Sequence, residues 1–290
     1  MLQALKSVRH LQSSAIKQAV SELCVPVPWG DLRGKIWGPV HGHPVLCLHG
    51  WADNCGTFNS LIPLLPAALQ WSKFSIIGHS MGGNVAGLFS ALYPEMVDAV
   101  VLLDSYGFFP TDKKEMGKVM RQGMDQMVQF EKMTEDKKRR VYTYENAVER
   151  LMAANPSLSE QSVHILLERG LVQVEGGVAF TRDLRINLKN ITRISLEQSL
   201  EFQSGIQASV LVILAEDGFE KMFIKPEEKK FTSAILQAYR DRNHAVVTVP
   251  GDHHVHLNDP KVVAPLVSDF LQTKVLTQPA QQTAEQTSKL

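Results

Sequence analysis

A glycine-flanked serine is the strongest chemical signal in the chain. Residues 78–82 read Gly-His-Ser-Met-Gly and match the pattern Gly-x-Ser-x-Gly. The apolar run 74–77 precedes them and helical spacing follows, which is the strand–turn–helix context of a nucleophilic serine. The strained turn needs neighbours almost without side chains, and Gly78 and Gly82 meet that need. We therefore predict that Ser80 is a nucleophile rather than an incidental serine in a glycine-rich turn.

A serine hydroxyl needs a neighbouring base to attack at neutral pH. The best candidate is His253, in segment 250–257, because it follows the last predicted strand and fits the chain order serine, acid, histidine. His254 and His256 are expected to pack nearby or to support the site. No carboxylate or thiolate cluster elsewhere in the sequence completes a recognisable zinc site with these three histidines, so we expect no metal, and we expect no cofactor.

A carboxylate should orient the histidine and stabilise its protonated form. Asp217 and Glu216 come just after the predicted strand 210–214, and Asp104 comes just after the predicted strand 99–103. We predict Asp217 as the acid. Glu216 and Asp104 stay open as alternatives, and each carboxylate could instead be a solvated loop residue.

Backbone amides should stabilise the oxyanion of the tetrahedral intermediate. One donor is usually the residue after the nucleophile, here Met81, and the second comes from the loop after an earlier strand. The segment His49-Gly50-Trp51 follows the apolar strand 45–48. We therefore predict the amides of Met81 and Trp51 as the oxyanion hole.

Short apolar runs alternating with helical segments predict an α/β fold with a parallel sheet. An antiparallel pair is expected to open the fold within residues 20–45. The expected organisation is a core in two parts, 1–104 and 196–272, a helical cap at 105–195 and a disordered polar tail at 273–290. Buried strands are expected at 45–48, 74–77, 99–103, 210–214 and 245–249.

Residues 46–51, 76–83 and 250–257 together resemble the α/β-hydrolase superfamily, and the resemblance extends over about residues 20–271. It implies a mostly parallel sheet with an inserted helical cap. Related epoxide hydrolases and haloalkane dehalogenases have aspartate at the nucleophile position, so Ser80 argues for ester-type hydrolysis. The resemblance implies a serine hydrolase that cleaves an ester, thioester or amide of a small-molecule acyl substrate through an acyl-enzyme.

The connection between the His-Gly strand and the serine strand is shorter than in that superfamily. A further strand and helix normally lie there, and each strand–helix–strand unit takes roughly 30 residues or more. Only residues 51–73 intervene here. We therefore expect one strand and one helix to be missing, as in an alternatively spliced form, with the opening pair losing its neighbour. The alternative function is a catalytically impaired isoform that acts as a binding or regulatory protein.

Composition points to no charged partner. The 30 basic and 30 acidic side chains balance, so no field favours nucleic acid or an anionic membrane. The uncharged stretch 74–94 is interrupted by glycines and a turn, so we expect no membrane span.

The last three residues, Ser288, Lys289 and Leu290, form the peroxisomal address Ser-Lys-Leu. We therefore expect a peroxisomal import receptor as partner and a peroxisomal location with some protein in the cytoplasm. A competing signal is the acid-free first 21 residues, which faintly resemble a mitochondrial transit segment.

Overall fold

The computed structural model describes residues 10–11, 20–28, 30–38, 43–65, 73–133, 140–222 and 226–276. The expected targeting tripeptide, Ser288 to Leu290, and most of the expected polar tail lie outside these residues. Among the described helices, none is long and apolar enough to cross a membrane.

A five-stranded parallel sheet forms the centre of the fold, in the order β10-β9-β6-β5-β4. The expected buried runs all lie in these strands, which confirms the parallel sheet. Their apolar, β-branched sequences are typical of strands covered on both faces. The bounds are β4 Val45–Leu48, β5 Phe74–His79, β6 Val97–Leu103, β9 Ser209–Asp217 and β10 Ala245–Asp252.

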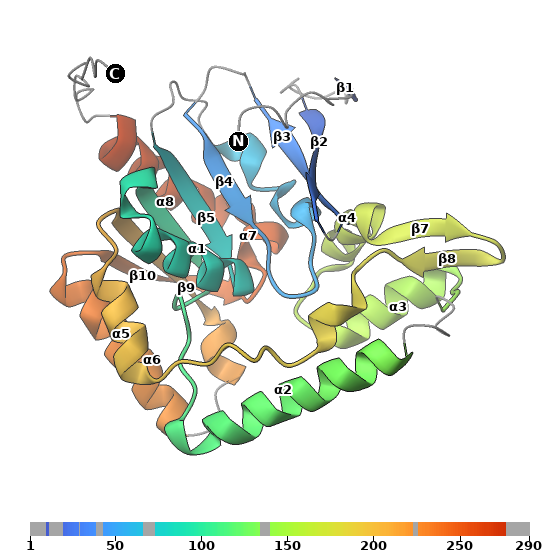
Figure 1. The fold of residues 1–290 in the computed structure, drawn as a ribbon. Coiled ribbons are helices and arrows are strands. Elements are labelled where there is room, and N and C mark those ends of the chain that lie inside the picture. The colour runs from blue at the N-terminus through green and yellow to red at the C-terminus, as the bar shows by residue number, and fades with distance from the viewer. Residues whose placement is uncertain are drawn as a thin grey trace, which may run out of the picture.

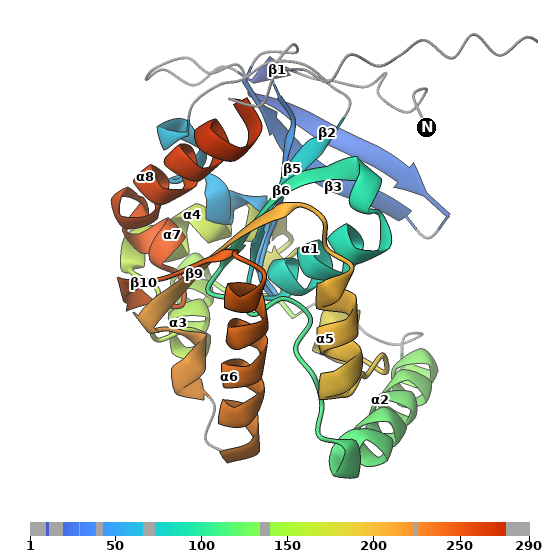
Figure 2. The ribbon, with the colours of Figure 1, turned by 90° about the vertical axis from the view of Figure 1, so that its left-hand side faces the viewer.

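Helices cover both faces of this sheet (Figures 1 and 2). One face packs against α1 (Met81–Leu92), α5 (Leu196–Ser204) and α6 (Pro226–Asp241). The other face packs against α8 (Pro260–Leu271) and a short helical turn at Cys55–Phe58. The short α7 (Val255–Asn258) begins directly after His253 and His254 and contains His256. The result is three layers, with the apolar core on the two faces of the sheet.

The segment between β6 and β9 contains α2 (Lys113–Met133), α3 (Tyr144–Ala154) and α4 (Glu160–Gly170). Thr143 and Ser159 begin α3 and α4, each accepting a hydrogen bond from a backbone amide of the first turn. The segment is not wholly helical, because β7 (Leu171–Val174) and β8 (Gly177–Phe180) form an antiparallel hairpin after α4. The segment expected as a helical cap therefore also contains a β-hairpin, which the sequence analysis did not predict.

The opening antiparallel pair is confirmed, and it stands apart from the main sheet. β2 (Val20–Val27) pairs with β3 (Gly30–Trp37), and β1 (His10–Leu11) adds a short third strand. Among the described strands, β4 pairs only with β5. The expectation that β4 would be fully buried is wrong, because Val45 and Leu46 are 36% and 46% exposed along this unpaired edge. Because none of the described strands pairs with the outer edge of β4, that edge is open to solvent.

Candidate active site

Ser80 lies in a sharp turn between β5 and α1. Its backbone has φ 52° and ψ −116°, a left-handed conformation that is costly for a residue with a side chain. A Cβ on Gly82 would collide with the Leu48 carbonyl oxygen, and one on Gly83 would collide with Ser105 Oγ. The Ser80 amide also donates to the Leu103 carbonyl at 3.2 Å. The turn therefore holds Ser80 in place by contacts that only glycine neighbours permit.

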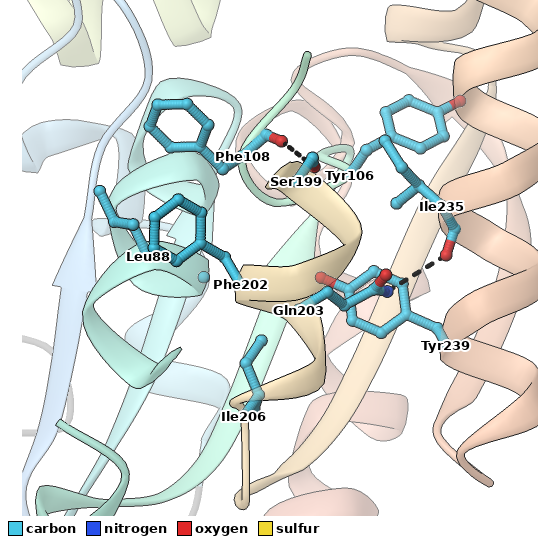
Figure 3. A pocket seen from close by; sticks show the side chains of 10 residues that line it. Leu88, Tyr106, Phe108, Ser199, Phe202, Gln203, Ile206, Ile235 and Tyr239 are labelled. Carbon is cyan, nitrogen blue, oxygen red and sulfur yellow. Dashed lines mark hydrogen bonds between the residues drawn. The ribbon is translucent and has the colours of Figure 1, made fainter. Parts of the chain in front are cut away.

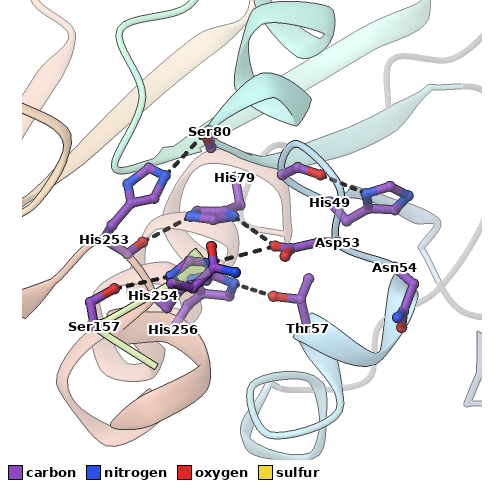
Figure 4. Close-up of polar contacts among 12 residues, drawn as sticks. His49, Asp53, Asn54, Thr57, His79, Ser80, Ser157, His253, His254 and His256 are labelled. Atoms are coloured by element: carbon purple, nitrogen blue, oxygen red, sulfur yellow. Dashed lines mark hydrogen bonds and ion pairs between the residues drawn. The ribbon is translucent and has the colours of Figure 1, made fainter. Parts of the chain in front are cut away.

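Ser80, His253 and Asp104 form a continuous chain of hydrogen bonds. The distance from Ser80 Oγ to His253 Nε2 is 3.1 Å, and that from His253 Nδ1 to Asp104 Oδ2 is 2.6 Å (Figure 4 shows the Ser80–His253 contact). Because a carboxylate accepts the hydrogen of Nδ1, the neutral ring leaves the Nε2 lone pair facing Ser80. The imidazole is thus oriented to take the proton of the serine hydroxyl.

The choice of Asp217 as the acid is corrected by this geometry. The Asp217 side chain is 77% exposed and its Oδ1 lies 3.6 Å from Lys221 Nζ. Glu216 is also exposed. Asp104, one of the two alternatives left open, has a side chain only 2% exposed and contacts His253 directly. Asp217 is the last residue of β9 and pairs with Asp252 of β10, and both acidic residues at this end of β9 are exposed to solvent.

Backbone groups fix the Asp104 carboxylate. Its Oδ1 accepts from the Ala215 amide at 3.0 Å and its Oδ2 accepts from the Phe219 amide at 2.6 Å. Its own backbone has φ 42°, which turns the side chain back over the end of the sheet. Gly218 passes so close that any Cβ there would collide with the carboxylate oxygens. These contacts satisfy a buried charge and orient it toward His253.

The predicted oxyanion residues lie at the same end of the sheet as Ser80. Met81 is the first residue of α1, so its amide has no carbonyl partner within that helix. Trp51 follows β4, which pairs with β5 in register at Leu48 and Gly78. The Trp51 side chain is 55% exposed, and its Nε1 donates to the Ile186 carbonyl at 2.8 Å. The Trp51 loop is thereby tied to the segment that follows β8.

Behind His253 lies a group of buried polar residues that the sequence analysis only partly anticipated. His254 and His256 are 5% and 0% exposed, as expected for packing or supporting residues. His79 and Asp53 were not singled out, although they contact this group. His79 Nε2 donates to the His253 carbonyl at 2.8 Å. Two sequence features could have pointed to them: Asp53 lies three residues after Gly50, and His79 lies next to Ser80.

A small cavity of about 10 Å³ lies elsewhere, between α1, α5 and α6 (Figure 3). The Gln203 side chain lies beside it and donates to the Ile235 carbonyl at 3.1 Å. The volume fits about one water molecule. Its lining includes neither Ser80 nor His253, so this cavity is not the acyl-binding site.

The α/β-hydrolase fold family matches residues 66–141 of the chain. Among solved structures, a hypothetical protein from Pseudomonas aeruginosa has a TM-score of 0.69 at 23% sequence identity, covering 90% of this chain and 99% of its own. That likeness shows the same fold.

Two relatives are similar over most of their length. The zebrafish (Danio rerio) serine hydrolase-like protein is 48% identical and covers 100% of both chains. The human (Homo sapiens) serine hydrolase-like protein 2 is 33% identical over 90% of this chain and 97% of its own.

The zebrafish alignment spans 328 positions, whereas this chain has 290 residues. At least 38 aligned positions, the difference between those lengths, therefore have no residue here. That number is close to the size of one strand and one helix with their turns. By its similarity over full length to these relatives, the chain belongs to the serine hydrolase-like proteins of the α/β-hydrolase superfamily.

Proposed function

We propose that this protein is a serine hydrolase that cleaves an ester, thioester or amide of a small acyl substrate. The observation that carries the proposal is the unbroken hydrogen-bonded chain from Ser80 Oγ through His253 to the buried Asp104 carboxylate. These are the groups needed to activate a serine hydroxyl and to stabilise the imidazolium that results. No other residue is required to relay the proton.

In the proposed reaction, Ser80 Oγ attacks the substrate carbonyl while His253 Nε2 accepts the hydroxyl proton. As the first tetrahedral intermediate collapses, the bond between the carbonyl carbon and the leaving group breaks, and His253 gives its proton to the departing alcohol, thiol or amine. Water, deprotonated by His253, then attacks the acyl-enzyme. The bond between the carbonyl carbon and Ser80 Oγ breaks, His253 returns the proton to Oγ, and the carboxylic acid is released. The amides of Met81 and Trp51 stabilise the oxyanion of both tetrahedral intermediates.

The test is the kinetics of p-nitrophenyl acetate hydrolysis by the full chain. We expect a burst of p-nitrophenol that measures acyl-enzyme formation, and an acetyl group on Ser80 in the quenched protein. Ser80→Ala should abolish both without changing the circular dichroism spectrum. Hydrolysis that persists in Ser80→Ala would place the chemistry elsewhere.

A second function has one observation in its favour. The edge of β4 is exposed, and β1, β2 and β3 form a separate sheet. Both features fit a shortened, alternatively spliced isoform with a weakened core. Such an isoform would be impaired in catalysis and would act as a binding or regulatory protein. Thermal melting separates the two functions. A cooperative melt together with the p-nitrophenol burst would exclude the impaired isoform, whereas a broad melt without a burst would support it.

For its location, we propose import into peroxisomes, with some protein in the cytoplasm, through Ser288, Lys289 and Leu290 at the C-terminus. The test is the location of an N-terminal fluorescent fusion in cells with a peroxisomal marker. We expect overlap with the marker that is lost when Leu290 is deleted. A mitochondrial signal for the chain with a free N-terminus would contradict this proposal.

A further inference from the structure

Three buried side chains beneath Ser80 converge on one another (Figure 4). They are Asp53 in the loop after β4, His79 at the end of β5 and His254 just before α7. Asp53 Oδ2 lies 3.7 Å from His79 Nδ1 and 3.6 Å from His254 Nε2. These three atoms all lie within 4.8 Å of one another, and the three side chains are each no more than 8% exposed.

The hydrogen positions leave two acceptors facing each other. His79 Nε2 lies 2.8 Å from the His253 carbonyl, which only accepts, so Nε2 carries the hydrogen. In the neutral ring, His79 Nδ1 therefore points a lone pair at Asp53. Neither His79 Nδ1 nor Asp53 Oδ2 has a hydrogen-bond partner among the described residues. Buried polar atoms without a partner are rare and costly, so this arrangement calls for a ligand between them.

We propose that Asp53, His79 and His254 form a binding site for a divalent transition-metal cation of the zinc type. Two imidazole nitrogens and one carboxylate oxygen are the ligands that zinc takes in proteins. Ligand atoms around a tetrahedral zinc ion lie about 3.4 Å apart. The Asp53 oxygen, at 3.6 and 3.7 Å from the two ring nitrogens, is close to that spacing, and the two nitrogens, which lie within 4.8 Å of each other, would draw together around the ion.

The outer contacts of the two histidines fit metal ligation. A ligating histidine usually donates its second ring nitrogen to a carbonyl or to another polar group, which fixes the ring. His79 donates Nε2 to the His253 carbonyl, and His254 Nδ1 lies 3.5 Å from Ser157 Oγ. The zinc site rejected from sequence consisted of His253, His254 and His256. Asp53 and His79 were absent from it because they are about 175–200 residues away along the chain.

The site would join the segments that make up the active site. Asp53 belongs to the loop that also carries Trp51, His79 precedes Ser80, and His254 follows His253. A cation held by all three residues fastens the loop after β4 to the ends of β5 and β10. Because it binds the folded chain only, it should raise thermal stability. The inference concerns binding and does not depend on hydrolysis.

The test is a cobalt titration of the full, metal-free chain, followed by visible absorption, with zinc competition to obtain the affinity. We expect one equivalent of cobalt, displaced by zinc, and a melting temperature that rises with zinc concentration. His254→Gln and Asp53→Asn should each weaken binding at least about tenfold. His164→Gln, which removes an exposed histidine of α4 beside Glu160, is the matched control and should bind as tightly as the natural sequence.

Two results would overturn the site. One is a folded natural chain, judged by circular dichroism, that shows no cobalt absorption at hundred-micromolar cobalt and no zinc-dependent rise in melting temperature. The other is unchanged affinity in both His254→Gln and Asp53→Asn. Since the two variants remove ligands from different segments, misfolding of one still leaves the other to decide.

Discussion

Strands β4 and β5 have similar apolar sequences but very different surroundings. Leu46 and Ile76 are partners in the parallel register, yet Leu46 is 46% exposed and Ile76 is completely buried. β5 has partners on both sides, whereas β4 pairs only with β5 among the described strands. The exposed edge of β4 is therefore open to solvent along the described part of the sheet. One edge of the sheet can thus be exposed while Ser80, His253 and Asp104 stay in hydrogen-bond contact.

The largest expected effect is the difference in hydrolysis rate between a variant of the buried Asp104 and a variant of the exposed Asp217. Asp104→Asn should slow p-nitrophenyl acetate hydrolysis by about 10⁴-fold, because the amide cannot hold His253 in the tautomer that faces Ser80. Asp217→Asn is the matched control and should leave the rate within about twofold, since its partner is the exposed Lys221. Equal losses in the two variants would contradict the assignment of Asp104.

The next effect is the difference in stability lost when the paired residues Leu46 of β4 and Ile76 of β5 are each shortened to alanine. Ile76→Ala removes a fully buried side chain and should lower the free energy of unfolding by about 2–5 kcal/mol. Leu46→Ala should lower it by less than about 1 kcal/mol, because much of that side chain is in contact with water. Urea denaturation followed by tryptophan fluorescence measures both. If Leu46→Ala costs as much as Ile76→Ala, the edge of β4 is covered.

Adding a strand and a helix beside β4 should remove the difference in burial between β4 and β5. We expect a strand–helix segment of about 40 residues, inserted after Pro66, to raise the free energy of unfolding by at least about 2 kcal/mol, since several backbone groups of β4 gain partners. It should also speed the labelling of Ser80 by a fluorophosphonate. Native and lengthened chains with equal stability and equal labelling rates would show that residues 51–73 already form a complete connection.

The smallest effect concerns the contact between the opening sheet and α4. Arg169 donates two hydrogen bonds to Glu22, at 2.8 and 2.7 Å. That contact lowers the pKa of Glu22, so its stabilisation is present above the unfolded pKa of about 4.3 and is lost as pH falls through the folded value. Because Glu22 is 36% exposed, solvent screening limits the contribution to under about 1 kcal/mol.

Glu22→Gln should therefore be slightly less stable than the natural chain at pH 7 and equally stable near pH 3, as measured by urea denaturation. Glu115→Gln, which removes an exposed pair on α2, should show no measurable change. A difference that grows as pH falls would have the wrong sign for this contact.

The sequence was sufficient to locate the strands of the main sheet, the turn at Ser80 and His253, because apolar runs and glycines act over short distances, but it did not reveal the β7–β8 hairpin. Asp104 could not be chosen over Asp217, because both follow a predicted strand. The choice depends on the left-handed backbone at Asp104 and on amides donated by Ala215 and Phe219, which lie more than 100 residues away. The buried contacts of Asp53 and His79 also come from distant segments, so local patterns could not reveal them.

We claim that Ser80 of this 290-residue chain is a reactive nucleophile, held by His253 and Asp104. The most direct measurement is peptide-mapped mass spectrometry of the native-length chain after reaction with a fluorophosphonate. We predict one adduct, on Ser80, that forms in the folded protein and does not form when the chain is unfolded in urea before the reagent is added. A chain that melts cooperatively but carries no adduct on Ser80 would contradict the claim.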